Sequence, residues 1–247
     1  MKLIRNTVII LMLILSLVQP ALCLEYAYAS VDDSIYEHLK NWDTNFRMDY
    51  YDSDVINIIR NEAKHDDYLY LSLIGLVCRK NGKDTDVEAK YRTTKEQETY
   101  VDNEVNNIIK AIIKDNMTEY DKVYAINQYL VNRFEYDYTL VNNNSYLALV
   151  NNTTTCQGYS MVAYKLFKAA GIDARIIVGQ INNINHGWNL VKVDGNWYHV
   201  DITNNDSVRE NKYFLRSDNF LKSEGFTWEA KDYVQIPYDY SLLRALK

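Results

Sequence analysis

The sequence predicts an α+β protein in which an amphipathic helix beginning at Cys156 packs on an antiparallel β-sheet. Apolar residues at helical spacing fill residues 156–170, and strand-like apolar stretches follow them. An Asp-Gly pair between the last two stretches is typical of a tight hairpin, so these two strands are expected to be antiparallel. Two prolines and eight glycines in 247 residues argue against a sandwich of many short strands.

Residues 1–29 have the pattern of a secretory signal peptide. Two basic residues precede an apolar run over residues 8–18, which is too short to span a bilayer comfortably. Small residues at Ala27 and Ala29 form one cleavage site, and Ala21-Leu22-Cys23 is a second. A lipidated Cys23 and an uncleaved anchor remain alternatives. In each case we expect a secreted or cell-surface protein that meets the membrane through this segment alone.

The charge balance bears on possible partners. The chain has 27 basic and 33 acidic side chains, a formal net charge of −6, and no basic patch. Nucleic-acid binding relies on clustered positive charge, so we expect no nucleic-acid partner. The abundance of Asn, Tyr, Ile and Lys is typical of an AT-rich coding sequence and favours a bacterial source.

Residues 30–115 are expected to form a small α/β subdomain, and residues 116–247 a second domain that contains Cys156. Local patterns predict the elements of the subdomain: a helix over 55–63, a strand or buried helix over 69–78, a strand over 86–91 and a long helix over 94–114. Thr118 begins a further helix, with acidic residues in its first turn.

The helix that begins at Cys156 carries the first candidate functional residue. Gly171 stands where a helix commonly ends, and we expect Thr155 or Thr154 to cap the first turn. A thiol in that turn lies near free backbone N–H groups at the positive end of the helix dipole, which favours the thiolate. The apolar face consists of Tyr159, Val162, Ala163, Leu166, Phe167 and Ala170.

The predicted hairpin brings a histidine close to an aspartate. We expect strands over 174–180, 187–193 and 196–201, with Asp194-Gly195 as a two-residue loop between the last two. In that register His186 is the diagonal neighbour of Asp201 on one face, at roughly 7 to 8 Å between backbones. A slip of one residue would place the two side chains on opposite faces. A thiol, a histidine and a carboxylate are the groups that covalent acyl transfer requires.

Five sequence pieces occur here in an order that resembles the transglutaminase-like superfamily, whose core follows the papain-like plan. They are Cys156-Gln157-Gly158-Tyr159, Ala170-Gly171-Ile172 with Val178-Gly179, His186-Gly187-Trp188-Asn189, Asp194-Gly195-Asn196-Trp197-Tyr198 and Val200-Asp201-Ile202-Thr203. The resemblance extends from about Asp121 to Trp228. Many relatives carry Trp after the Asp-x-Thr of the last piece, and here Asn204 stands there.

The resemblance implies roles for the three residues. Cys156 would be the nucleophile, His186 the base and Asp201 the carboxylate that orients the histidine. The reaction would be acyl transfer through a thioester, without a cofactor, on protein or peptide amides such as cell-wall peptide or surface protein. Water as acceptor would give a peptidase or amidase and a lysine amine a crosslinking transglutaminase, and the sequence leaves this choice open. An exported binding module that keeps the fold without catalysis is the alternative.

An oxyanion hole would need hydrogen-bond donors beside the thiol. The backbone N–H of Cys156 is the natural first donor, because it lies at a helix start. Gln157 and Tyr146 are weaker candidates for the second.

Several other interpretations of these residues stay open at this point. His199 alternates with Asp201, so by geometry alone it could be the base, whereas the family pattern favours His186. The two histidines with Cys156 and Asp201 could bind zinc, although no C-x-x-C or H-x-x-x-H spacing is present. A disulfide between Cys78 and Cys156 is the simplest reading of two cysteines in an exported protein.

After the hairpin, the sequence predicts a polar turn over 204–207 and a last strand over 213–215.

Overall fold

A computed structural model describes residues 34–245, which form two compact units, one up to Tyr91 and one from Arg92. This division lies earlier than the boundary at residue 115 predicted from the sequence. The reason is that the helix over 95–112 packs against helices of the second unit. The predicted signal segment, residues 1–29, lies outside the described residues. Within residues 34–245, no helix is long and apolar enough to cross a membrane.

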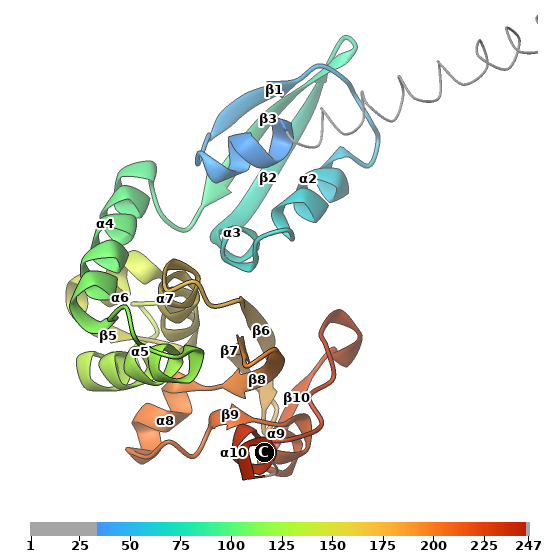
Figure 1. Ribbon diagram of the computed structural model, residues 1–247. Coiled ribbons are helices and arrows are strands. Elements are labelled where there is room, and N and C mark those ends of the chain that lie inside the picture. The colour runs from blue at the N-terminus through green and yellow to red at the C-terminus, as the bar shows by residue number, and fades with distance from the viewer. Residues whose placement is uncertain (1–33, 246–247) are drawn as a thin grey trace, which may run out of the picture. The chain divides into compact units, whose positions relative to one another are not determined.

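The first unit is a three-stranded antiparallel sheet packed with helices (Figure 1). Its strands lie in the order β1-β3-β2. The predicted helix over 55–63 is confirmed as α2, whereas the apolar run over 69–78 divides between a helix and a strand. The first part of the run forms a helix because the Asp66 side chain caps it, accepting hydrogen bonds from the N–H groups of Tyr68 and Leu69. The elements are β1 (Asn45–Met48), α2 (Val55–Ala63), α3 (Asp67–Ser72), β2 (Leu73–Asn81) and β3 (Asp84–Tyr91).

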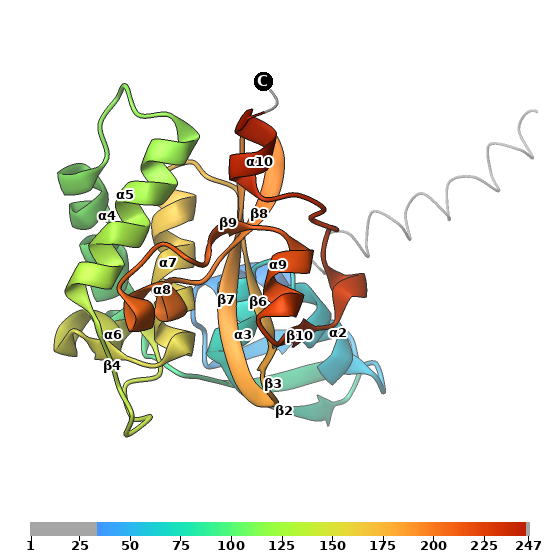
Figure 2. The same ribbon diagram turned by 90° about the horizontal axis from the view of Figure 1, so that it is seen from below.

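The second unit begins with four helices. Thr94 and Thr118 form capping boxes at the starts of the first two, as their sequence pattern predicts. The first three helices pack around the fourth, and Figure 2 shows all four gathered on one side of strand β7. The helices are α4 (Lys95–Ile112), α5 (Glu119–Arg133), α6 (Ser145–Asn151) and α7 (Cys156–Ala169).

A five-stranded antiparallel sheet in the order β10-β6-β7-β8-β9 supports α7, which packs on β6 and β7. The expected helix on an antiparallel sheet is therefore confirmed. The strands are β6 (Ala174–Ile181), β7 (Ile184–Val193), β8 (Asn196–Val200), β9 (Phe214–Arg216) and β10 (Phe226–Trp228). The largest side chains buried in this unit are Trp188, Tyr159, Tyr198, Phe134, Phe167 and Phe226.

Short elements complete the second unit. Strands β4 (Glu135–Tyr136) and β5 (Thr153–Thr154) pair in parallel just before α7. The chain after β8 forms α8 (Ile202–Val208), so the polar turn predicted over 204–207 is wrong. A buried N-cap explains the difference, because the Asp201 side chain accepts from the backbone N–H of Asn204 and starts a helix there. The remaining elements are α9 (Asp218–Ser223), a 3₁₀ turn η1 (Ala230–Asp232) and α10 (Tyr240–Ala245).

Candidate active site

Cys156 lies in the first turn of α7, where the sequence predicts it. The helix ends as expected, with Gly171 just beyond its C-cap in the left-handed region at φ +77°. Asn189 on β7 fixes the helix to the sheet, because its buried amide donates to the backbone carbonyls of Ser160 and Arg175. These bonds set the distance between the start of α7 and the strand that carries His186.

The expected side-chain cap of α7 is absent. Thr155 occupies the N-cap position without a side-chain cap hydrogen bond. The hydroxyl of Thr154 is not available either, because it donates to the backbone carbonyl of Asn142 at 2.6 Å. The backbone N–H groups around Cys156 are therefore not capped by either threonine.

The hairpin between β7 and β8 has the predicted register. Val193 pairs with Asn196, and Asp194 and Gly195 form the loop at φ +51° and +80°. Two positive φ values are what a type I′ loop requires. His186 Nε2 then lies 2.7 Å from Asp201 Oδ2, so the two side chains meet on one face as predicted.

The Cys156 thiol is in hydrogen-bonding contact with the His186 ring and with the backbone N–H of Gly187. Since Asp201 holds Nε2, the other ring nitrogen is left for the thiol. Burial alone would raise the pKa of Cys156, but the hydrogen bond and charge of His186 outweigh it and leave the thiol pKa below its ordinary value. Burial would lower the pKa of His186, but Asp201 and the thiol raise it to about 10. Both shifts favour a thiolate beside an imidazolium.

The His186 ring packs against two aromatic side chains. Trp188 stacks on it at 5.8 Å between centroids and 18° between planes, and Phe226 meets it edge-on. His186 is 8% exposed and Asp201 is fully buried. Little water reaches the pair, so the attraction between its charges is screened less than at a surface.

His199, the rival base, is engaged elsewhere. Its Nδ1 accepts from Trp188 Nε1 at 3.0 Å, and its Nε2 lies 2.9 Å from Asp218 Oδ1. It is 1% exposed, and burial keeps its pKa below the ordinary value despite Asp218. Both ring nitrogens are occupied, so His199 has no lone pair directed toward Cys156.

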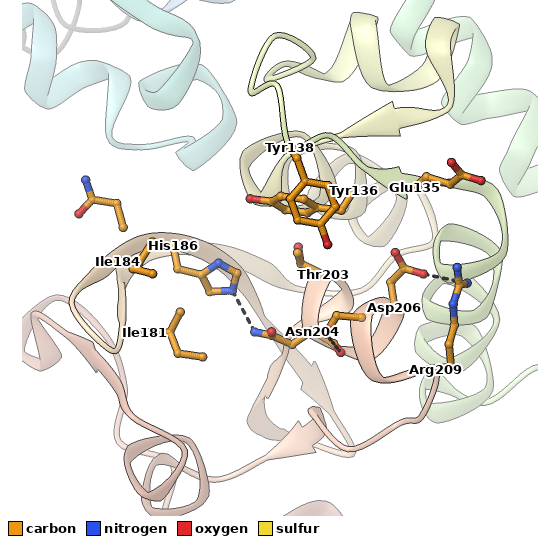
Figure 3. Close-up of a pocket in the computed structure, with 12 residues that line it drawn as sticks. Glu135, Tyr136, Tyr138, Ile181, Ile184, His186, Thr203, Asn204, Asp206 and Arg209 are labelled. Carbon is orange, nitrogen blue, oxygen red and sulfur yellow. Dashed lines mark hydrogen bonds and ion pairs between the residues drawn. The ribbon is translucent and has the colours of Figure 1, made fainter.

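A pocket of about 530 Å³ opens beside His186 (Figure 3). Tyr136 and Tyr138 reach it from β4 and the following loop, and Ile181 and Ile184 from the adjoining ends of β6 and β7. The remaining lining residues are Glu135, Asn185, His186, Thr203, Asn204, Asp206, Ser207 and Arg209.

The two weaker oxyanion candidates make other contacts. Gln157 Nε2 lies 3.8 Å from the sulfur of Met161, and the Tyr146 ring packs edge-on against Tyr100 at 5.4 Å. Tyr136, which the sequence analysis does not name, lines the pocket. Burial raises the pKa of the Tyr136 hydroxyl, and this residue lies close enough to Cys156 for the charge of the thiolate to raise that pKa further. Its place depends on the pairing of β4 with β5, which no local pattern in the sequence indicates.

The structure also bears on the other interpretations of the cysteines and histidines. Cys78 and Cys156 are both free thiols, so the disulfide interpretation is wrong. Among residues 34–245, no group of three or more His, Cys, Asp or Glu side chains is arranged to hold a metal ion.

The sequence around this site matches a known protein family. Residues 106–202 match the Transglutaminase-like superfamily. Residues 106–202 therefore form a domain of the transglutaminase-like superfamily. The match covers α5, the approach to Cys156, and the hairpin that carries His186, and it ends just after Asp201. The superfamily comprises cysteine-based hydrolases and acyltransferases, so the transglutaminase-like domain is of an enzyme type.

The solved structures that are similar to this chain are distant in sequence. A TGase is 18% identical with a TM-score of 0.41, over 64% of this chain and 50% of its own. A proposed cysteine protease from Cytophaga hutchinsonii is 14% identical with a TM-score of 0.37, over 53% and 62%. A proposed protease from Parabacteroides distasonis is 9% identical with a TM-score of 0.33, over 51% and 35%. The alignment thus spans about half the length of the TGase, and no protein of curated function matches the sequence.

Proposed function

We propose that this protein carries out cysteine-dependent acyl transfer on protein or peptide amides outside the cytoplasm. One observation carries the proposal: a thiol at a helix start, a histidine and a buried carboxylate are linked in series beside a pocket. These are the nucleophile, base and orienting group of Cys156, His186 and Asp201. The export of the protein rests on the pattern of residues 1–29.

The reaction follows from the charges at the site. The Cys156 thiolate attacks the carbonyl carbon of an amide, which forms a C–S bond and moves an electron pair onto oxygen. The backbone N–H of Cys156 is the nearest donor for that oxygen. As the C–N bond breaks, His186 gives its proton to the departing nitrogen, and a thioester remains. Water or an amine then attacks the thioester, His186 takes up the proton of the attacking group, and the thiolate is regenerated.

The pocket beside His186 supports a polypeptide substrate with a large apolar side chain near the reacting amide. Tyr138 is 86% exposed and Ile184 is 69% exposed, and both line the pocket. Such exposed apolar side chains contact ligands at binding grooves, because covering them removes apolar surface from water. Tyr138→Ala and Ile184→Ala are therefore expected to raise KM with a smaller effect on kcat.

The decisive experiment measures cleavage and crosslinking together. The protein is incubated with a casein-like substrate, with and without a labelled primary amine, and both fragments and incorporated label are measured. Fragments without incorporated label support a hydrolase, and incorporated label supports a transglutaminase. Cys156→Ala is expected to abolish either activity, whereas the matched variant Cys78→Ala retains it.

A covalent thiol probe distinguishes this proposal from a binding module without catalysis. An activated Cys156 should react with iodoacetamide much faster than Cys78, because burial raises the pKa of Cys78 while His186 lowers that of Cys156. Equal and slow labelling of both cysteines would contradict the proposed function.

A further inference from the structure

Asn204 lies against the His186–Asp201 pair, at the position where many relatives carry Trp. We infer that Asn204 is a positioning residue, whose side chain holds Asp201 Oδ2 on His186 and closes that oxygen off from the pocket. This inference rests on the proposed function, because it concerns the same pair.

The contacts of the amide define the role. Asn204 Nδ2 donates to Asp201 Oδ2 at 2.5 Å, the same oxygen that lies 2.7 Å from His186 Nε2. The amide nitrogen is also 3.4 Å from His186 Nε2, as the dashed line in Figure 3 marks. His186 donates its Nε2 proton to the carboxylate, so the two N–H groups share one acceptor. A flipped amide would set oxygen against oxygen, which fixes the orientation of Asn204.

Asp201 needs these donors because it is fully buried. A buried carboxylate stays charged only when its oxygens accept hydrogen bonds. Oδ2 accepts from His186 and the Asn204 amide, and Oδ1 accepts from the Asn204 backbone N–H at 3.0 Å. Asn204 thus supplies two of the three bonds, and its side chain supplies the one on the oxygen that faces the histidine.

The two roles of Asn204 are separable by mutation. The backbone bond to Oδ1 is the N-cap of α8, and a change of side chain other than to proline leaves it in place. The amide is half-buried and lines the pocket, so its removal would let water reach Oδ2. Asn204→Ala should therefore fold and keep α8, while the His186–Asp201 contact loosens.

The surroundings of His186 make its titration a direct measure of this contact. Among the described residues, the titratable groups against the ring are Cys156 on α7 and Asp201 before α8. The strands packed on it present the rings of Trp188 from β7 and Phe226 from β10. Water admitted beside the carboxylate weakens its attraction for the imidazolium, so the pKa of His186 should fall toward its ordinary value.

The test is an NMR titration of the histidine rings in the protein and in Asn204→Ala, with Val208→Ala as control. Val208 lies on the same helix, is exposed and does not line the pocket. In Asn204→Ala we expect His186 to titrate about one pH unit lower, a tenfold change in its protonation equilibrium. His199 should titrate unchanged in each protein.

The outcomes separate this inference from the proposed function. If His186 titrates at an ordinary pKa in the unsubstituted protein, the proposed base is wrong. If it titrates high there and unchanged in Asn204→Ala, only the positioning role is wrong. A raised KM with an unchanged titration would mean that Asn204 contacts substrate instead. Asn204→Ser, which keeps a shorter hydroxyl donor, should recover part of the shift, and a loss equal to that in Asn204→Ala would also count against the inference.

Discussion

Replacing Gly158 with alanine tests how the first turn of α7 is built. Gly158 lies two residues after Cys156, and a Cβ there would stand 1.9 Å from Thr154 Oγ1 and 3.0 Å from Thr154 Cβ. That hydroxyl is not free to move, because it is buried and donates to the Asn142 carbonyl at 2.6 Å. Gly158→Ala must therefore break this hydrogen bond or shift the turn that carries Cys156.

The expected change in the free energy of unfolding is the difference between a lost hydrogen bond and a gain in helix propensity. Leaving the buried hydroxyl and carbonyl without each other costs about 1 to 3 kcal/mol. Alanine in place of glycine in a helix returns up to about 1 kcal/mol. We expect Gly158→Ala to lower the free energy of unfolding by about 1 to 2 kcal/mol, and to slow alkylation of Cys156 where the turn shifts instead.

A double-mutant cycle with Thr154→Ala gives the sharpest measurement. Thr154→Ala removes the clashing oxygen at the cost of the same hydrogen bond and keeps only the contact with Cβ at 3.0 Å, so Gly158→Ala should cost less in that background. The coupling energy, from urea unfolding followed by tryptophan fluorescence, should then be about 1 kcal/mol or more. Equal costs of Gly158→Ala in the two backgrounds would refute the steric explanation.

Further predictions follow from the site. His186→Ala should lower kcat about 10³-fold or more in steady-state assays, as removal of a triad base does. His199→Ala should instead lower the free energy of unfolding by about 1 to 2 kcal/mol and leave measurable turnover, and the reverse pattern would assign the base to His199. Gly195→Val should reduce kcat from the far end of the hairpin, because Val strains a loop position at φ +80°, and a variant with normal kcat would contradict the role of the loop. As pH falls below the ordinary thiol range, alkylation of Cys156 should persist while that of Cys78 stops, as mass mapping of the two peptides would measure. A parallel decline in the labelling of both cysteines would contradict this prediction.

Helices with local signals could be predicted from the sequence, and elements that depend on distant partners could not. The helix over 55–63 has the predicted bounds, and those beginning after Thr94 and Thr118 start with the expected capping boxes. The apolar run over 69–78 could not be divided, because its residues suit a buried helix and a strand equally. The second unit begins before α4 and not at residue 116, because the sequence reveals the apolar face of α4 but not the helices against which that face packs.

The same distinction between local signals and distant partners applies to the candidate site. The meeting of His186 and Asp201 could be predicted because a two-residue loop fixes the register between them. The amide of Asn204 could not be placed, since its position depends on α8. The polar residues after Asp201 give no apolar periodicity from which this helix could be predicted. A polar run beginning with a buried aspartate is equally compatible with a turn and with a capped helix.

Residue type and sheet face do not distinguish His186 from His199. The two differ in the partner of the ring nitrogen that does not face an aspartate. Each histidine faces an aspartate through Nε2, His186 at 2.7 Å from Asp201 and His199 at 2.9 Å from Asp218. On His199 the other nitrogen accepts the Trp188 N–H, so a proton there would break a buried hydrogen bond and the ring stays neutral. Trp188 stacks on His186 without a bond to its nitrogen, which leaves that nitrogen to the thiol. One indole thus holds His199 in a structural role and orients His186 for chemistry.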